Sequence, residues 1–301
     1  MKKLFATLLV CLMMTALFAA FNPAYSDYQF YNLHDYATDK AYLEKALTEA
    51  SSADEKAEIL WRLARVELTL TDDIDDDKEF KQQRLDGYAK AEALAVESLS
   101  LKETYNAYHW QASAIGRIGQ VNGPLNSLGK AKPMRELVEK VQNEFNADYT
   151  DSWYVLGILY NQLPGGPISF GDKDAAISYM RRCVDTQDNV NRTNLTNYLE
   201  LAEQLEDRDW SASKRAKEFE KMKKKYDAAT VPTEKMEYYE GKDGKSGKPF
   251  YSSVTLDKMS DKQEAVMLLR YALAFYEKSP IKFATDAEKL EEIRELIDDL
   301  T

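Results

Sequence analysis

The sequence predicts an all-α protein built from helix pairs of the tetratricopeptide type. Its composition favours helices, because 301 residues include only 12 Gly and 8 Pro, and 44% of them are hydrophobic. The stretch from Trp153 to Tyr160 matches Trp-x2-Leu-Gly-x2-Tyr, the first-helix signature of such a repeat. Small residues recur among large ones at Ala64, Ala112, Gly157 and Ala202, at separations of 48, 45 and 45 residues. We therefore expect about four helix pairs in a compact α-solenoid, followed by a C-terminal helical extension.

Residues 1–26 are expected to be a secretory signal. Lys2 and Lys3 precede an apolar run at residues 4–21, and Ala24-Tyr25-Ser26 places small residues where a signal peptidase reads. We expect cleavage before Asp27 and a periplasmic or secreted protein. An uncleaved anchor is the alternative, because the apolar run approaches the length that spans a bilayer. Cys11 lies within the run after Val10, so a lipid anchor is not expected.

Residues 27–230 are expected to form the repeat domain. It would begin with an aromatic lead-in at residues 27–36, which shows no helical period and is expected to be extended. Apolar residues at three- and four-residue spacing then predict the helices of the repeats. These helices cover residues 38–47, 52–69, 78–99, 105–120, 132–145, 153–160, 172–184, 189–206 and 210–226.

Residues 231–301 are expected to supply a loop and C-terminal capping helices. Residues 240–249 carry three Gly among Lys and Asp, so we expect a mobile surface loop there. Amphipathic helices are expected at 261–278 and 284–300, where a polar outer face would close the end of the solenoid. A second irregular stretch, rich in turn residues, is expected within the repeat domain at residues 121–130.

The loop after the signature helix is the candidate functional site. Relative to a usual repeat, about seven residues are inserted within 164–171, where Pro stiffens the chain and Gly permits unusual backbone angles. An exposed Phe170 and neighbouring aromatic rings would supply contacts to a ligand or a partner. A tight helix-ending turn is the alternative interpretation. The candidate residues are His109, Trp110, Trp153, Tyr154, Tyr160, Pro164, Gly165, Gly166 and Phe170.

Charge and missing motifs argue against several other functions. The net charge of −11 disfavours a nucleic-acid groove, which needs a clustered basic face. The acidic run at residues 72–77 lacks the central Gly of an EF-hand loop, so an exposed loop is favoured over a metal site. His109 belongs to no nucleophile motif, and Cys183 falls at a small-residue position of a packed helix. We expect no enzyme activity, no cofactor and no metal.

Six stretches carry a resemblance to a known family: Tyr108-His109-Trp110, residues 123–129, Trp153 to Tyr160, Leu163-Pro164-Gly165-Gly166-Pro167, Gly171-Asp172-Lys173 and Tyr198 to Glu203. They resemble the T-component family of tripartite ATP-independent periplasmic (TRAP) transporters, and more distantly the regulators of microtubule dynamics. The resemblance implies an exported helical protein that associates with the substrate-binding component of the transporter and has a cavity for small, partly apolar ligands.

The leading hypothesis is therefore an exported accessory protein without catalytic activity. Its expected partner is a periplasmic solute-binding protein, with a small apolar ligand as a second candidate occupant. The alternative is a general repeat scaffold for protein assembly in the bacterial cell envelope. A nucleic-acid partner is not expected, and homo-oligomerisation is left open.

Overall fold

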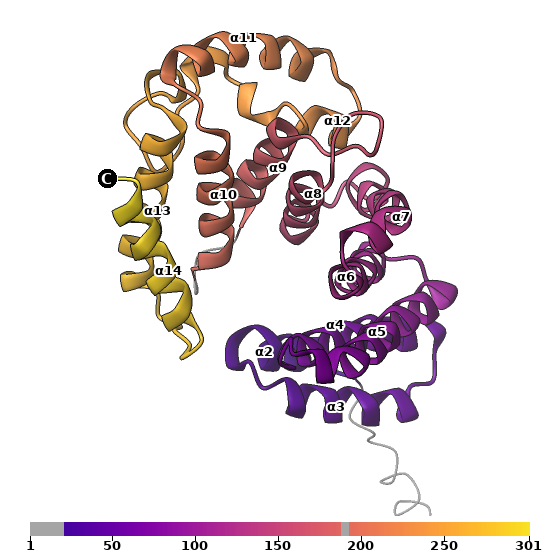
Figure 1. Ribbon diagram of the computed structural model, residues 1–301. Helices are drawn as coiled ribbons and strands as arrows, with labels where there is room; N and C mark the ends of the chain where they lie inside the picture. Colours follow the sequence, from indigo (N-terminus) through magenta and orange to yellow (C-terminus); the bar gives the residue numbers. More distant parts are fainter. Residues whose placement is uncertain (1–20, 188–192) are drawn as a thin grey trace, which may run out of the picture. The chain divides into compact units, whose positions relative to one another are not determined.

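The computed structural model describes residues 21–187 and 193–301, and all of the regular elements in these ranges are helical (Figure 1). The predicted all-α, helical-repeat class is confirmed by helices that pack against their neighbours along the chain. Contacts divide the chain into two units, Met1–Asn122 and Gly123–Thr301, which are described separately. Most of the predicted signal lies outside the described residues. None of the described helices is long and apolar enough to cross a membrane.

The first unit is built around one long helix, α4. Its buried face packs against α3, α5 and α6, and Ala64 on that face is fully buried. Ser52 caps this helix by accepting a hydrogen bond from the Glu55 amide at 3.1 Å. The elements of this unit are α2 Pro23–Tyr28, the π-helical turn η1 Gln29–Leu33, α3 Tyr36–Glu49, α4 Ala53–Asp72, η2 Lys78–Phe80, α5 Lys81–Leu101 and α6 Tyr105–Asn122.

The prediction of an extended lead-in at residues 27–36 is wrong, because this segment is largely helical. Asn22 caps α2 and Pro23 occupies its first turn, which are both helix-starting features. The helix passes into the π-turn η1, which ends at His34 with a left-handed φ of 52°. The change from α to π geometry within a few residues removes the regular period that would have revealed it.

The second unit has the helix pair α8 and α9 near its start, and α10 then packs against both α9 and α13. Gly157 of α8 and Ala202 of α10 are buried at these contacts, as their places in the pattern predict. The elements are α7 Pro124–Asn143, α8 Thr150–Gln162, α9 Lys173–Thr186, α10 Leu195–Arg208, α11 Ala212–Ala228, α12 Pro232–Met236, η3 Tyr239–Gly241, η4 Gly244–Ser246, η5 Leu256–Lys258, α13 Asp261–Lys278 and α14 Asp286–Asp299.

The long connection predicted at residues 121–130 is also wrong. Helix α7 begins at Pro124, directly after Gly123, whose φ of 83° breaks the chain direction. The amides in the first turn of a helix have no acceptor within the helix, so a proline there loses no hydrogen bond. The Gly-Pro pair therefore starts a helix here and does not mark a loop.

Residues 240–249 are packed, which contradicts the prediction of a mobile surface loop. Glu240, Gly241 and Gly244 are buried, and η3 and η4 lie against α11. The approach is so close that a Cβ on Gly241 would lie 2.3 Å from the Cβ of Met222. Glu240 meets arginine charges from other helices, as described below, while Lys242, Asp243, Lys245 and Lys248 are exposed on the outer side of the stretch.

Candidate functional site

The loop between α8 and α9 is held in a defined shape by its own backbone. The Gly171 amide donates to the Pro164 carbonyl at 3.2 Å, and the Asp172 amide donates to the Tyr160 carbonyl at 3.1 Å. Glycine is required where the two ends of the loop meet, since a Cβ on Gly171 would lie 1.9 Å from the Leu163 carbonyl oxygen. Gly166 adopts a left-handed φ of 70°. The loop therefore has a defined conformation and is not a flexible linker.

A groove runs between this loop and one face of α7. Its volume is about 470 Å³, and Leu128, Lys132 and Arg135 line it from α7 at helical spacing. The loop supplies the opposite wall through residues 166–170. A volume of this order can hold a small ligand or a few side chains of a partner.

Phe170 lines this groove and is half-buried, so the prediction that it is exposed is wrong. Its ring centre lies 5.2 Å from that of Tyr160, and the Arg135 guanidinium lies 4.2 Å from the Phe170 ring centre. Ile168 is the exposed apolar side chain of the loop, with 69% of its surface accessible. Sequence reasoning missed it because β-branched residues are usually buried.

The groove is basic where it is charged. Lys132 and Arg135 line it, and none of its described lining residues is acidic, although the whole chain carries a net charge of −11. Glu136 lies 3.7 Å from Lys132 and Glu139 lies 3.3 Å from Arg135, each one helical turn further along α7. Stacking on Phe170 holds the Arg135 guanidinium in place, which lowers the entropic cost of pairing it with an acidic group.

Tyr160 connects the groove to α12. Its hydroxyl donates to Glu237 Oε1 at 3.2 Å, and its ring lies 5.2 Å from that of Tyr179. Burial raises the pKa of Glu237 despite this hydrogen bond, and it also raises the pKa of Glu139. Asn143 joins α7 to the start of α12 by bonding the amide and hydroxyl of Thr233. Polar contacts thus join α7 and α8 to the segment of α12.

Trp153 and Tyr154 pack in the core of the second unit. Trp153 is 2% exposed, stacks on Tyr179 at 6.0 Å between ring centres, and donates from Nε1 to Asp148 Oδ1 at 2.8 Å. Tyr154 packs against the cluster formed by α9, α10 and α13. Pro164 and Gly165 are exposed in the loop beside the groove.

His109 and Trp110 belong to α6 in the first unit, where both are buried. His109 Nε2 lies 3.5 Å from Ser113 Oγ, one helical turn away. Trp110 packs with Ala64 and Ala107, and its Nε1 has no hydrogen-bond partner. These positions indicate packing roles within their own unit.

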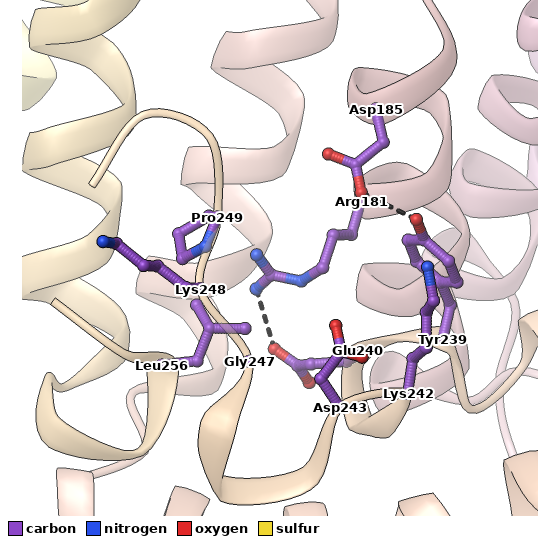
Figure 2. Close-up of a pocket in the computed structure, with 10 residues that line it drawn as sticks. All are labelled: Arg181, Asp185, Tyr239, Glu240, Lys242, Asp243, Gly247, Lys248, Pro249 and Leu256. Carbon is purple, nitrogen blue, oxygen red and sulfur yellow. Dashed lines mark hydrogen bonds and ion pairs between the residues drawn. The ribbon is translucent and has the colours of Figure 1, made fainter. Parts of the chain in front are cut away.

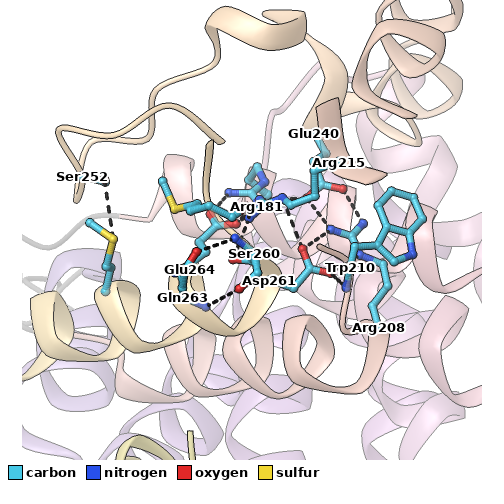
Figure 3. A network of polar contacts seen from close by, with 12 residues as sticks. Arg181, Arg208, Trp210, Arg215, Glu240, Ser252, Ser260, Asp261, Gln263 and Glu264 are labelled. Carbon is cyan, nitrogen blue, oxygen red and sulfur yellow. Dashed lines mark hydrogen bonds and ion pairs between the residues drawn. The ribbon is translucent and has the colours of Figure 1, made fainter. Parts of the chain in front are cut away.

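A buried cluster of ion pairs in the second unit was not predicted from the sequence (Figure 3). Arg181 of α9, Arg208 of α10 and Arg215 of α11 converge on acidic groups from η3 and α13. Glu240 accepts from Arg208 at 2.5 Å and from Arg181 at 2.9 Å. Six charged side chains of this arginine cluster are nearly inaccessible: Arg181, Arg208, Arg215, Glu240, Asp261 and Glu264.

The cluster balances three positive charges against three negative ones. Arg181 also bonds Glu264 at 2.5 Å, and Arg208 bonds Asp261 at 2.8 Å. Burial alone would raise the pKa of Glu240, but the charges of Arg208 and Arg181 outweigh burial and lower it to about 2. Because every acid faces at least one arginine, the cluster fastens residues 240–264 to three repeat helices.

A small cavity of about 50 Å³ adjoins this cluster (Figure 2). The buried Arg181 and Glu240 line it together with the exposed Lys242, Asp243 and Lys248. Tyr239 donates from its hydroxyl to Asp185 Oδ2 at 2.9 Å beside it. Both charge signs are present in this small space, which suits bound water better than an ion of one sign.

Two observations concern a possible nucleophile and a possible metal site. Cys183 is buried, and burial raises the pKa of its thiol well above the usual value, so it lacks the properties of a nucleophile. Within residues 21–187 and 193–301, no group of three or more His, Cys, Asp and Glu side chains is arranged to hold a metal ion.

One family model matches part of the chain. The family model described as regulator of microtubule dynamics protein 1-3 matches residues 28–163. No curated protein and no solved structure matches the chain. The matched part includes α8 and ends at Leu163, directly before the loop that forms the groove.

Proposed function

We propose that this chain is an exported accessory protein without catalytic activity, which binds the solute-binding component of a TRAP-type transporter through the groove beside the α8–α9 loop. The motifs that resemble the T-component family include this loop, Leu163-Pro164-Gly165-Gly166-Pro167. The match of residues 28–163 to the model of regulator of microtubule dynamics protein 1-3 supports the helical fold that the proposal needs, and the transporter partner rests on the motifs alone.

The observation that carries the proposal is the exposure of Ile168 on a rigid support. Ile168 is 69% exposed, and the loop beneath it is braced by backbone hydrogen bonds and by Phe170. A rigid apolar projection beside a groove has the character of an interface anchor, since it loses little entropy on binding.

The chemistry of the groove indicates which partner segment it would accept. An apolar side chain would cover Ile168 and Leu128, and an adjacent carboxylate would meet Lys132 and Arg135. We therefore propose an acidic segment with a neighbouring apolar residue on the partner's surface. A small apolar ligand is the second proposed occupant of the same groove.

The alternative proposal is a general scaffold for protein assembly in the cell envelope. Repeat proteins commonly bind extended partners over several helix pairs, so a scaffold would use surfaces outside the groove as well. The exposed Val96 and Leu101 on α5 of the first unit are apolar positions that such a partner could cover.

The test is direct binding between the purified chain and the solute-binding protein of a TRAP-type transporter from the same cell. The proposal expects saturable binding that is weakened by Lys132→Glu. Lys45→Glu is the matched control, because its side chain is 76% exposed, against 72% for Lys132, and it lies in the first unit. Equal binding by both variants would contradict a role for the groove, and absence of binding by the unaltered chain would favour the scaffold.

A further inference from the structure

The outer side of α11 carries a stripe of lysines. Five exposed lysines stand at positions i, i+3, i+7, i+10 and i+11 along this helix: Lys214, Lys217, Lys221, Lys224 and Lys225. At about 3.6 residues per turn, these positions fall within an arc of about 100°. Arg215, Phe219 and Met222 are buried on the other side, where α11 packs against η3 and η5. The stripe therefore faces solvent and takes no part in that packing.

A second row of lysines lies beside this stripe. Lys242, Lys245 and Lys248 are exposed and recur every three residues in the segment that packs η3 and η4 on α11. The Lys245 amide donates to Glu220 Oε1 of α11 at 3.3 Å, and Glu220 directly precedes a lysine of the stripe. The two rows thus form one surface, the lysine face: Lys214, Lys217, Lys221, Lys224, Lys225, Lys242, Lys245 and Lys248.

The lysine face is a positive region on an acidic chain. Residues 212–250 contain 11 Lys and Arg against 7 Asp and Glu, whereas the whole chain has a net charge of −11. Of the eight lysines of the face, only Lys221 forms an ion pair within the described residues, with Glu218 at 2.8 Å. Most of the positive charge is therefore available to a partner outside the chain.

The choice of lysine indicates what kind of partner this is. The only arginine within residues 212–250, Arg215, is buried. Lysine is depleted at protein–protein interfaces, where arginine is enriched. An ammonium group is a hydrated point charge that needs no fixed bidentate geometry, so it suits a layer of mobile phosphate groups. Clusters of roughly four to eight basic residues on a helix are typical of binding to anionic lipids.

We propose that the lysine face binds the surface of a bilayer that contains anionic phospholipid. The lysines attract the headgroup phosphates without insertion of α11, because the apolar side of this helix is already packed against Leu256 and Met259. The acidic remainder of the chain is repelled by the same surface, and this repulsion orients the bound chain. The lysine face shares no residue with the groove beside the α8–α9 loop, so the inference does not depend on the transporter partner.

The first measurement is titration of the purified chain with vesicles of phosphatidylcholine, either alone or mixed with phosphatidylglycerol. We expect tighter binding to the mixed vesicles. This preference should be lost when the ionic strength rises from about 0.1 M to about 1 M, because the Debye length falls from about 10 Å to about 3 Å. Equal binding to the two kinds of vesicle at low ionic strength would overturn the inference.

The second measurement assigns the binding to α11 through the double variant Lys217→Glu with Lys224→Glu. Both side chains are exposed, and neither forms an ion pair in the part of the chain that the structure describes, so the melting temperature should not change. Binding to the mixed vesicles is expected to weaken by at least about 10-fold, because two attractive charges become repulsive.

Lys45→Glu with Lys56→Glu is the matched control, because these exposed lysines of the first unit change the net charge by the same amount. The control should weaken binding much less, and an apolar leader retained on the chain would contribute equally to every variant. Equal weakening by both double variants would overturn the inference.

A short DNA duplex of mixed sequence is the comparison polyanion. We expect the mixed vesicles to bind more tightly at equal concentration of phosphate charges, because mobile headgroups can gather under both rows of lysines. Tighter binding to the duplex would overturn the assignment to lipid in favour of nucleic acid. Absence of binding to both would overturn it in favour of an acidic protein surface.

Discussion

Met180 of α9 lies directly over Gly157 of α8. A Cβ built on Gly157 would lie 2.6 Å from both Cγ and Sδ of Met180, well inside contact distance. Gly157 is the small residue of the signature Trp-x2-Leu-Gly-x2-Tyr, and Met180 is fully buried against it. The close pairing of these two helices, which positions the α8–α9 loop, depends on the missing side chain at this position.

Gly157→Ala is therefore expected to destabilise the chain by about 1–3 kcal/mol through overpacking, despite the better helix propensity of Ala. Urea denaturation measures the change. Gly129→Ala in α7 is the matched control, because a Cβ there would meet nothing within 4 Å, and a gain of about 0.5–1 kcal/mol is expected. A stabilising effect at both positions would refute the close contact of α8 with α9.

Glu240→Gln is expected to cost about 3–5 kcal/mol near neutral pH, because it leaves the charges of Arg181 and Arg208 undercompensated in a buried site. In the folded chain the pKa of Glu240 is about 2, below its usual value of 4.5. The ionised carboxylate therefore stabilises the folded state fully above pH 4.5, and this contribution is lost as the pH falls from 4.5 towards 2. The difference in the free energy of unfolding between the unaltered chain and Glu240→Gln should thus shrink as the pH falls from 4.5 to 2. Denaturant midpoints at a series of pH values measure it, with the exposed Asp243→Asn as control. A difference that does not change with pH would contradict the ionised state of Glu240.

The thiol of Cys183 is expected to resist alkylation by iodoacetamide in the folded chain at pH 8. Burial both raises its pKa and blocks access to it. The same residue should react within minutes once urea unfolds the chain, and mass spectrometry follows both rates. Rapid labelling without denaturant would show that α9 does not stay packed.

Phe170→Ala is expected to lower stability by about 1–3 kcal/mol, since the ring packs on Tyr160 and under Arg135. Thermal unfolding measures this loss, and Ile168→Ser should leave it nearly unchanged because Ile168 is exposed. A loss of stability on Ile168→Ser similar to that on Phe170→Ala would mean that the loop tip is packed.

The sequence predicted the helix pair α8 and α9 because its information is local. Trp153, Leu156, Gly157 and Tyr160 lie within three turns of one helix, and their sizes alone indicate a close neighbour. The irregular character of residues 164–171 was also visible in Pro and Gly. Which residue of the loop is exposed was not visible, because the burial of Phe170 depends on Arg135, 35 positions earlier in the chain.

The arginine cluster shows the opposite case. Glu240 stands in a hydrophilic stretch that is typical of a surface loop, and its partners Arg181 and Arg208 are 59 and 32 positions away. The sequence does not show whether a charged residue is buried, because its partners are known only from the three-dimensional structure. The packing of α13 against α10 could not be predicted either. The apolar faces that join these two helices are separated in the sequence by α11, α12 and three short 3-10 turns.

Binding of a protein partner by the α8–α9 loop is tested by the affinity of Ile168→Ser for the purified TRAP solute-binding protein. Val96→Ser in α5 is the matched control, with 45% of the native side chain exposed in the first unit. We expect Ile168→Ser to weaken binding by about 10-fold or more at unchanged melting temperature, because it removes an interface anchor, while Val96→Ser should bind like the unaltered chain. Equal affinity of all three chains would contradict it.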